Sequence, residues 1–279
     1  MTTATARQGS VSTRTLSLVG VFAIFAIYAI PLVYVLISSF KANTDISNHP
    51  LDLLFKPTLA AYQSVLTPAL FTAIGNSAII TILATAITFG CAVPLAYVLT
   101  RVNLRWTGIV IGVLIALQMV PASTAVIPLY SLLPALGLIG TLPGVALAIA
   151  AGTLPYAVLL LRPFYLAVPT EVMEAAAVDG AGLFRSFFAI TIPLVRNGLL
   201  VITILIFIGA WGEFLFAISF LSNSSQFPLS VLLVQQQGQY GTNYNAVMAL
   251  GLIGAVPTIL LFLFAARRLT SGLALGAGK

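Results

Sequence analysis

The 279-residue sequence is 60% hydrophobic and 6% charged, with a mean hydropathy of +1.10. A soluble globular domain carries about 25% charged residues, so this composition excludes that class and indicates an integral membrane protein. The net charge of +6 does not indicate nucleic-acid binding, because the basic residues stand beside apolar segments and act there as topology signals.

The N-terminal part of the chain predicts a tail, a membrane helix and a loop. Residues 1–15 are polar and lack apolar periodicity, so we expect a cytoplasmic tail. Residues 16–40 are apolar and uncharged, and this stretch is longer than the apolar region of a signal peptide. It is therefore expected to be a retained transmembrane helix. The polar residues 41–70 predict a solvated loop that holds His49, the single histidine.

Five further apolar segments follow, so the sequence predicts an all-α, polytopic membrane protein with six transmembrane helices. Each segment is long enough to cross about 30 Å of hydrocarbon. We find no internal repeat and no low-complexity linker, which indicates one domain with a separate first helix. The link at residues 130–141 is expected outside. The five spans are expected at about residues 71–100, 108–128, 142–161, 198–221 and 245–266.

The distribution of basic residues predicts the orientation of these spans. Ten basic residues fall on one side and two on the other, and the richer side of a membrane protein is cytoplasmic. Both termini and residues 162–197 are therefore expected in the cytoplasm, with His49 and Gln236 outside. The ten are Arg7, Arg14, Arg101, Arg105, Arg162, Arg185, Arg196, Arg267, Arg268 and Lys279; the two are Lys41 and Lys56.

Three of the six acidic residues lie in one segment, EVMEAAAVDGAGLFRSFFAITIP, which begins at Glu171. Thr170 is expected to cap a short helix whose first turn holds Glu171 and Glu174, since a helix N-terminus favours carboxylates. The alanines that follow supply helix propensity without bulk. Gly180 and Gly182 then free the backbone to turn. A polar loop of about 30 residues between apolar spans is unusually long, so a docking role is expected.

This segment resembles the EAA loop of permease subunits of binding-protein-dependent ABC importers. The matching positions are Glu174, Ala175, Ala176, Gly180, Ile190 and Pro193. Ile192 departs from the usual leucine, which is a swap between aliphatic residues of equal size. Similarity to the sugar-importer branch, whose members resemble the smaller maltose-transporter permease, extends from about Tyr62 to the C-terminus. The resemblance implies the type I ABC importer permease fold, with a core at residues 71–268, an EAA loop at 162–197 and a cytoplasmic tail at 269–279.

The resemblance also implies partners and site residues. A permease of this kind works in the cytoplasmic membrane with a homologous second permease, two ATP-binding subunits and an extracytoplasmic solute-binding protein. Its substrate would be a sugar or sugar-like solute. The ATPase-coupling residues would be Glu171, Glu174, Ala175, Ala176, Asp179, Gly180, Ile190 and Pro193.

No residue pattern for catalysis, nucleotide binding or metal binding is present in the sequence. A phosphate-binding loop needs Gly-Lys followed by Ser or Thr, and none of the three lysines stands in that setting. There is no acid and base pair, no nucleophile beside a histidine and no metal-ligand cluster. The single cysteine, Cys91, excludes a disulfide within the chain. We therefore expect a non-enzymatic chain without a cofactor, whose ATP and Mg²⁺ are held by the partner ATPase.

One carboxylate, Glu213, stands about midway along the expected fifth span. A charged residue there costs about 2.5–3.5 kcal/mol to insert, so it should face a wet cavity or a polar partner. The sugar-permease branch often has Trp, a polar residue and an acid here, and Trp211 to Glu213 resembles this pattern, with Gly212 as the departure. Two readings stay open: Trp211 and Glu213 line the substrate pathway, or Glu213 only ties two helices together by hydrogen bonding.

Three alternative functions compete with sugar import. A glycerol-phosphate-type ABC uptake permease is the nearest, although no cationic residue lies inside a span to meet a phosphate. A secondary transporter should show several ionisable groups at mid-membrane, whereas this chain offers one. A purely structural membrane scaffold would not need the spacing of the EAA loop.

Overall fold

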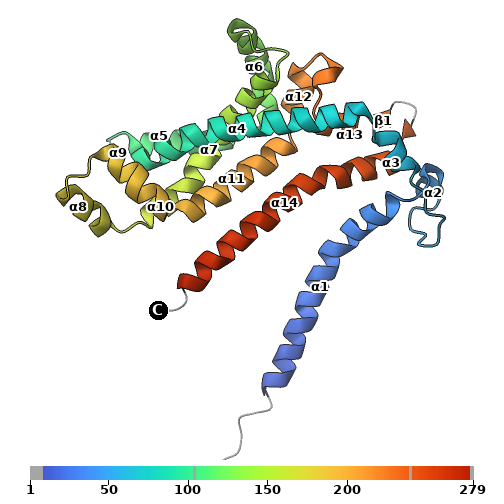
Figure 1. Ribbon diagram of the computed structural model, residues 1–279, viewed down its shortest axis with the longest axis horizontal. Coiled ribbons are helices and arrows are strands. Elements are labelled where there is room, and N and C mark those ends of the chain that lie inside the picture. The colour runs from blue at the N-terminus through green and yellow to red at the C-terminus, as the bar shows by residue number, and fades with distance from the viewer. Residues whose placement is uncertain (1–8, 103–104, 239–240, 277–279) are drawn as a thin grey trace, which may run out of the picture. The chain divides into compact units, whose positions relative to one another are not determined.

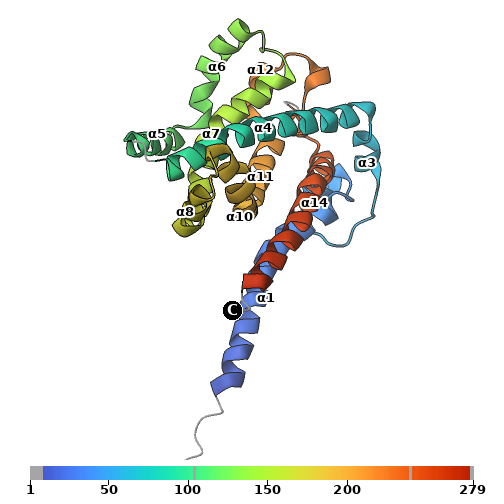
Figure 2. The same cartoon turned by 60° about the vertical axis from the view of Figure 1, so that its left-hand side comes forward.

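The computed structural model describes residues 9–102, 105–238 and 241–276 (Figures 1 and 2). Contacts divide the chain into two compact units. The first unit contains residues 1–66 and 236–253, and the second contains residues 67–235 and 254–279. The long helix α14, Tyr244–Gly276, begins in the first unit and continues into the second.

The first unit is built on α1, Gly9–Ser38. The apolar side chains of α1 from residue 16 to residue 37 are exposed or only partly buried, so this helix has little packing within the chain. The remaining elements of the unit are α2, Asn43–Asn48, α3, Ala60–Val65, and an antiparallel pair of short strands, β1, Gln237–Gly238, and β2, Gly241–Thr242.

A buried lysine organises the loop that follows α1. Lys41 is 1% exposed, and its ammonium group donates to the carbonyl oxygens of Pro50 at 3.2 Å and Asp52 at 2.5 Å. It also lies 5.2 Å from the centre of the Phe55 ring, close enough for a cation–π contact. His49 is exposed and lies 3.6 Å from the Asp52 carboxylate, so it is a solvated loop residue as expected.

Three long helices form the core of the second unit: α4, Pro68–Arg101, α7, Leu142–Leu166, and α11, Arg196–Trp211. Helix α4 packs most extensively against α7 and next against α11 (Figure 1). Alanines on α4 and α7 are fully buried at this contact. Small side chains allow transmembrane helices to approach closely, which explains the tight packing. The alanines with least exposure are Ala84, Ala92 and Ala96 on α4 and Ala146 and Ala157 on α7.

The predicted third span is present as two helical segments that meet at a sharp bend. Helix α5, Thr107–Gln118, is followed by η1, Ala122–Ala125, and α6, Val126–Leu132, at an angle of 98°. The break falls at Pro121, which lacks an amide hydrogen and disfavours helical geometry in the residue before it. The link expected at residues 130–141 is also partly helical, because η2 covers Leu133–Leu136.

The predicted fifth span is likewise interrupted. Helix α11 ends at Trp211, and a separate helix α12, Leu215–Phe220, follows after three residues. Glu213 therefore lies in a break and not inside a continuous helix, which corrects the expectation. Two short helices come next, η4, Ser224–Gln226, and α13, Leu229–Val234.

The described residues confirm an all-α membrane architecture. Four of the described helices are long and apolar enough to cross a membrane, or up to six if each of two bent pairs counts as one span. These pairs are α5 with residues 122–136, and residues 183–194 with α11. Between α7 and α11 lie the elements of the predicted EAA loop: α8, Thr170–Val178, α9, Leu183–Arg185, the π-helix η3, Ser186–Thr191, and α10, Ile192–Leu194. The loop is shorter than its predicted range of 162–197, since α7 and α11 extend into both ends.

Candidate functional site

The short helix predicted after Pro169 is present as α8, but its N-terminus differs from expectation. Pro169 occupies the cap position, and no side chain accepts a cap hydrogen bond there. Thr170 is the first helical residue, so its predicted capping role was wrong. Glu171 lies in the first turn, whereas Glu174 lies one turn later, beyond the strongest influence of the helix N-terminus.

The C-terminus of α8 is a Schellman motif, which explains the need for Gly180. The amide of Ala181 donates to the carbonyl of Ala176 at 2.9 Å, and the amide of Gly180 donates to that of Ala177 at 3.0 Å. Gly180 has a φ of +73°, a left-handed conformation that glycine adopts at little cost. Gly182 has a φ of −67°, so only the first of the two predicted glycines uses this freedom.

Most of the predicted coupling residues are exposed on and after α8. Ala176 is buried within the chain, and Ile190 in the π-helix is half-buried. Among the described residues, no cation lies within ion-pair distance of the carboxylates here. The exposed members of the predicted set are Glu171, Glu174, Ala175, Asp179, Gly180 and Pro193.

Large apolar side chains share this exposed surface, and the sequence prediction missed them. Val178 is 88% exposed and Phe184 is 77% exposed, and Leu183 and Phe188 are also exposed. The signal was present in the sequence as a cluster of apolar residues within an otherwise polar loop. We refer to Glu171, Glu174, Val178, Asp179, Leu183, Phe184 and Phe188 together as the docking surface.

An aromatic cluster anchors the docking surface to the core. Phe187 is buried, with its ring centre 4.8 Å from that of Tyr97 on α4. Tyr165 on α7 packs edge-on against Tyr97, and its hydroxyl donates to the carbonyl of Val93 at 3.1 Å. The π-helix that carries Phe187 is stabilised by Thr191, whose hydroxyl donates to the carbonyl five residues earlier at 2.9 Å.

Arg101, expected only to mark the cytoplasmic side, also joins two elements. Its guanidinium group donates to the carbonyl oxygens of Tyr165 and Val168, at the end of α7 and in the connection to α8. A cation is favourable at a helix C-terminus, where carbonyl groups lack partners within the helix. No local pattern predicts this contact, because the residues are more than 60 positions apart.

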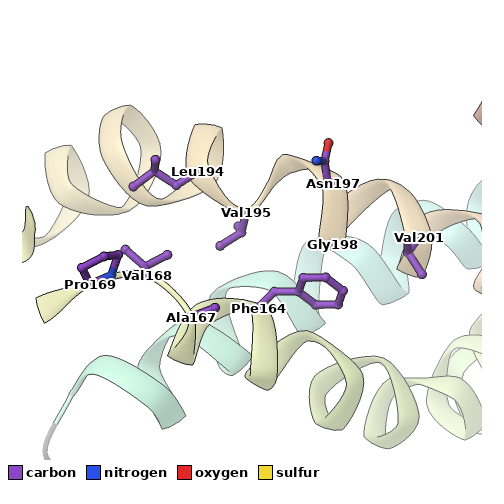
Figure 3. A pocket seen from close by; sticks show the side chains of 9 residues that line it. All are labelled: Phe164, Ala167, Val168, Pro169, Leu194, Val195, Asn197, Gly198 and Val201. Carbon is purple, nitrogen blue, oxygen red and sulfur yellow. The ribbon is translucent and has the colours of Figure 1, made fainter. Parts of the chain in front are cut away.

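A hollow of about 570 Å³ lies between the end of α7 and the start of α11 (Figure 3). Its walls are mostly apolar, and Asn197 contributes an amide. Figure 3 shows the Phe164 ring directed at Gly198. A Cβ atom at Gly198 would lie 2.3 Å from that ring, so this position requires glycine.

The two residues predicted for the substrate pathway lie at the break between α11 and α12. The Trp211 indole donates to the carbonyl of Gly254 on α14 at 2.9 Å and stacks on Phe207. The Glu213 carboxylate accepts hydrogen bonds from backbone amides of α12. Among the described residues, no group of three His, Cys, Asp or Glu side chains is placed to hold a metal ion.

The sequence matches, over residues 92–272, the family described as the inner membrane component of binding-protein-dependent transport systems. The match covers more than half of the chain. The chain belongs to this family. The permease is therefore a transport component and not an enzyme, as predicted.

Curated relatives match the permease over nearly its whole length. The inner membrane ABC transporter permease protein YcjP of Escherichia coli is 30% identical, over 95% of this chain and 98% of the relative. The sulfoquinovosyl glycerol transport system permease protein SmoH of Agrobacterium fabrum is 31% identical, over 89% and 88%. These relatives confirm the predicted family of ABC importer permeases.

A solved structure has the same fold as the permease. The crystal structure of a bacterial ABC transporter involved in the import of alginate contains a chain that superposes with a TM-score of 0.75. The two chains are 22% identical, and the match covers 95% of this chain and 99% of the other. The predicted type I importer permease fold is thereby confirmed.

Proposed function

We propose that this permease is a membrane-spanning subunit of an ATP-driven importer for a sugar or sugar-like solute. Curated relatives are permeases of transport or uptake systems for sulfoquinovosyl glycerol, diacetylchitobiose and arabinooligosaccharides, which all contain carbohydrate. The proposed assembly contains a second permease, two ATPase subunits and a solute-binding protein. ATP and Mg²⁺ would bind in the ATPase subunits, and this chain would hold no cofactor.

The composition of the docking surface is the observation that supports a role in coupling the permease to the ATPase. It combines exposed apolar side chains with carboxylates that have no cation near them among the described residues. Asp179 caps the C-terminus of α8, where the helix dipole disfavours a negative charge by about 0.3–1 kcal/mol. The Asp179 carboxylate therefore does not stabilise α8. A cation on a partner protein that pairs with this carboxylate explains its presence better. We infer that the partner is the ATPase, with a groove that is apolar in its centre and basic at its rim.

The proposed orientation puts the docking surface and both termini in the cytoplasm of the cell, where ATP is available. The asymmetry of basic residues supports it. Arg7 and Lys279 lie outside the described residues, and the other ten basic residues lie within them. When the ATPases close, movement of α8 would be transmitted by Phe187 and the aromatic cluster to α4 and α7. The pathway would then open to the other side of the membrane. The break at Trp211 and Glu213 is proposed to border that pathway.

Reconstitution tests the proposed function. A tagged permease should co-purify with two ATPase subunits and a second permease, and the complex in proteoliposomes should take up sugar only with ATP and the solute-binding protein. A thermal-shift screen on that binding protein, with sugars and glycerol phosphates side by side, identifies the solute class. Stabilisation by glycerol phosphates alone would replace the sugar assignment, and uptake driven by an ion gradient without ATP would refute the ABC mechanism.

A further inference from the structure

The break between α11 and α12 needs a physical explanation, because it falls within the predicted fifth span. Helix α11 has 16 residues and rises about 24 Å, which is less than the hydrocarbon thickness of about 30 Å. Arg196 begins α11, and a charged arginine stays near an interface. The break at residues 212–214 therefore lies at membrane depth, where unpaired backbone groups are costly and must find partners within the protein.

The carboxylate of Glu213 supplies partners to the start of α12. One of its oxygens accepts the amide of Phe216 at 2.8 Å, and the other accepts the amide of Ala217 at 3.2 Å. These are the second and third amides of the helix, which a serine, threonine or aspartate at the cap position usually satisfies. Here the cap position is Phe214, whose side chain has no acceptor. Glu213 stands one residue earlier, and its longer side chain reaches both amides.

Two other helices contact the same corner, and a third contact holds the far end of α12. The Ser230 hydroxyl on α13 donates to the carbonyl of Glu213 at 2.6 Å. Trp211 is held to α14 through the carbonyl of Gly254. At its other end, α12 is held by the amide of Gly140, which donates to the carbonyl of Phe220 at 3.0 Å. The orientation of α12 is thus set at both ends, and Glu213 provides the attachment at the first.

We propose that Glu213 is a positioning residue, whose carboxylate caps α12 and fixes the corner of the proposed pathway without contacting the solute. The inference rests on the proposed function in so far as the corner borders the pathway. It favours the structural reading of Glu213, because each carboxylate oxygen already accepts a backbone amide within the chain. The carboxylate keeps further lone pairs, so the KM measurement below decides between the two readings. The functional consequence is that Glu213 controls how fast the pathway changes state, and other groups bind the sugar.

The test compares Glu213→Gln, which keeps one acceptor oxygen, with Glu213→Met, which keeps the length but no acceptor. Both are made in a Trp106→Phe background, so that Trp211 is the single tryptophan. Emission of Trp211 and its quenching by acrylamide are measured on the purified permease without solute. Loss of the cap should release the corner, so the methionine variant should show red-shifted emission and at least a two-fold rise in quenching, with the glutamine variant between it and the parent.

Transport by the assembled complex supplies the second measurement, with the sugar selected by the binding-protein screen. We expect the uptake rate per assembled complex to fall about five-fold in Glu213→Met, while the KM for the sugar stays within two-fold. If Glu213 only stabilised the fold, its replacement would lower the amount of assembled complex and leave the uptake rate per complex unchanged. If the methionine variant does not assemble, the glutamine variant carries the same comparison.

Two results would overturn the proposal. A rise of ten-fold or more in KM for Glu213→Gln, with unchanged Trp211 emission, would assign solute contact to the carboxylate. Unchanged emission and unchanged rate in Glu213→Met would make the cap dispensable. The fluorescence measurement needs no solute, so its outcome is independent of whether the parent complex takes up sugar, and failure of the proposed function is seen separately in the parent.

Discussion

Replacing Gly180 gives the sharpest test of the docking surface. Among the described residues other than Gly180 and its two neighbours in sequence, no atom lies within 4 Å of a Cβ atom built at Gly180, so a side chain there meets open space. The intrinsic cost is conformational: an L-residue at a φ of +73° loses about 1–2 kcal/mol, and asparagine loses less. The effects of backbone strain and of added bulk can therefore be separated by the choice of residue.

Three variants make this separation. Gly180→Ala adds strain with little bulk, Gly180→Asn adds bulk with little strain, and Gly180→Trp adds both. If an ATPase closes on this surface, Gly180→Trp should lower the retained ATPase by about 30-fold or more, since disrupting an interface hot spot costs about 2 kcal/mol or more. Gly180→Asn should also release ATPase, because its side chain points into the interface.

The assay is co-purification of the ATPase with tagged permease, quantified against the amount of permease inserted in the membrane. ATP-dependent uptake is measured on the same preparations. Stoichiometric ATPase and normal uptake in Gly180→Trp would show that the segment is a connector, and the docking role would be refuted. Loss of ATPase in Gly180→Ala with full retention in Gly180→Asn would show that only the shape of the helix end matters.

Three further predictions follow from other parts of the permease. In a variant without its native cysteine, a cysteine at Glu174 should be protected from an impermeant reagent in intact cells and one at Gln236 should be labelled; the reverse would refute the orientation. Gly198→Ala should lower the stability of the fold by about 1–3 kcal/mol, because its methyl group overlaps the Phe164 ring, and in thermal unfolding the same substitution should cost much less in a Phe164→Ala background. Arg101→Met should lower the unfolding midpoint by roughly 5 °C through two lost charge-assisted hydrogen bonds, and an unchanged midpoint would contradict that role.

Hydropathy and spacing were sufficient to predict the class of fold and the position of helix α8 with the turn at Gly180. Continuous apolar composition marks membrane depth regardless of contacts, so α1, α4, α7 and α14 were found within a few residues. The glycine after the alanines predicted a turn, and Gly180 has the left-handed conformation that a Schellman motif requires. These features depend on local physics alone.

The missed features depend on contacts between distant residues or on breaks hidden in apolar sequence. A hydropathy window averages over Gly212 and Glu213, so the fifth span looked continuous although α11 ends at Trp211. The bond from Arg101 to Val168 joins segments with no local relation. Thr170 was expected to cap α8 because threonine favours that position, but the preceding proline occupies it.

The sparse packing of α1 has a consequence for how its sequence can vary. From residue 16 to residue 37 none of its side chains is fully buried within the chain. Packing within the permease therefore requires only that these side chains be hydrophobic. Exchanges among leucine, isoleucine, valine and phenylalanine should be nearly neutral there for folding, whereas the alanines between α4 and α7 should accept little change. In a saturation library of α1, a helix face at which substitutions impair function would then indicate a contact with another subunit. Substitutions in α1 can therefore report on assembly.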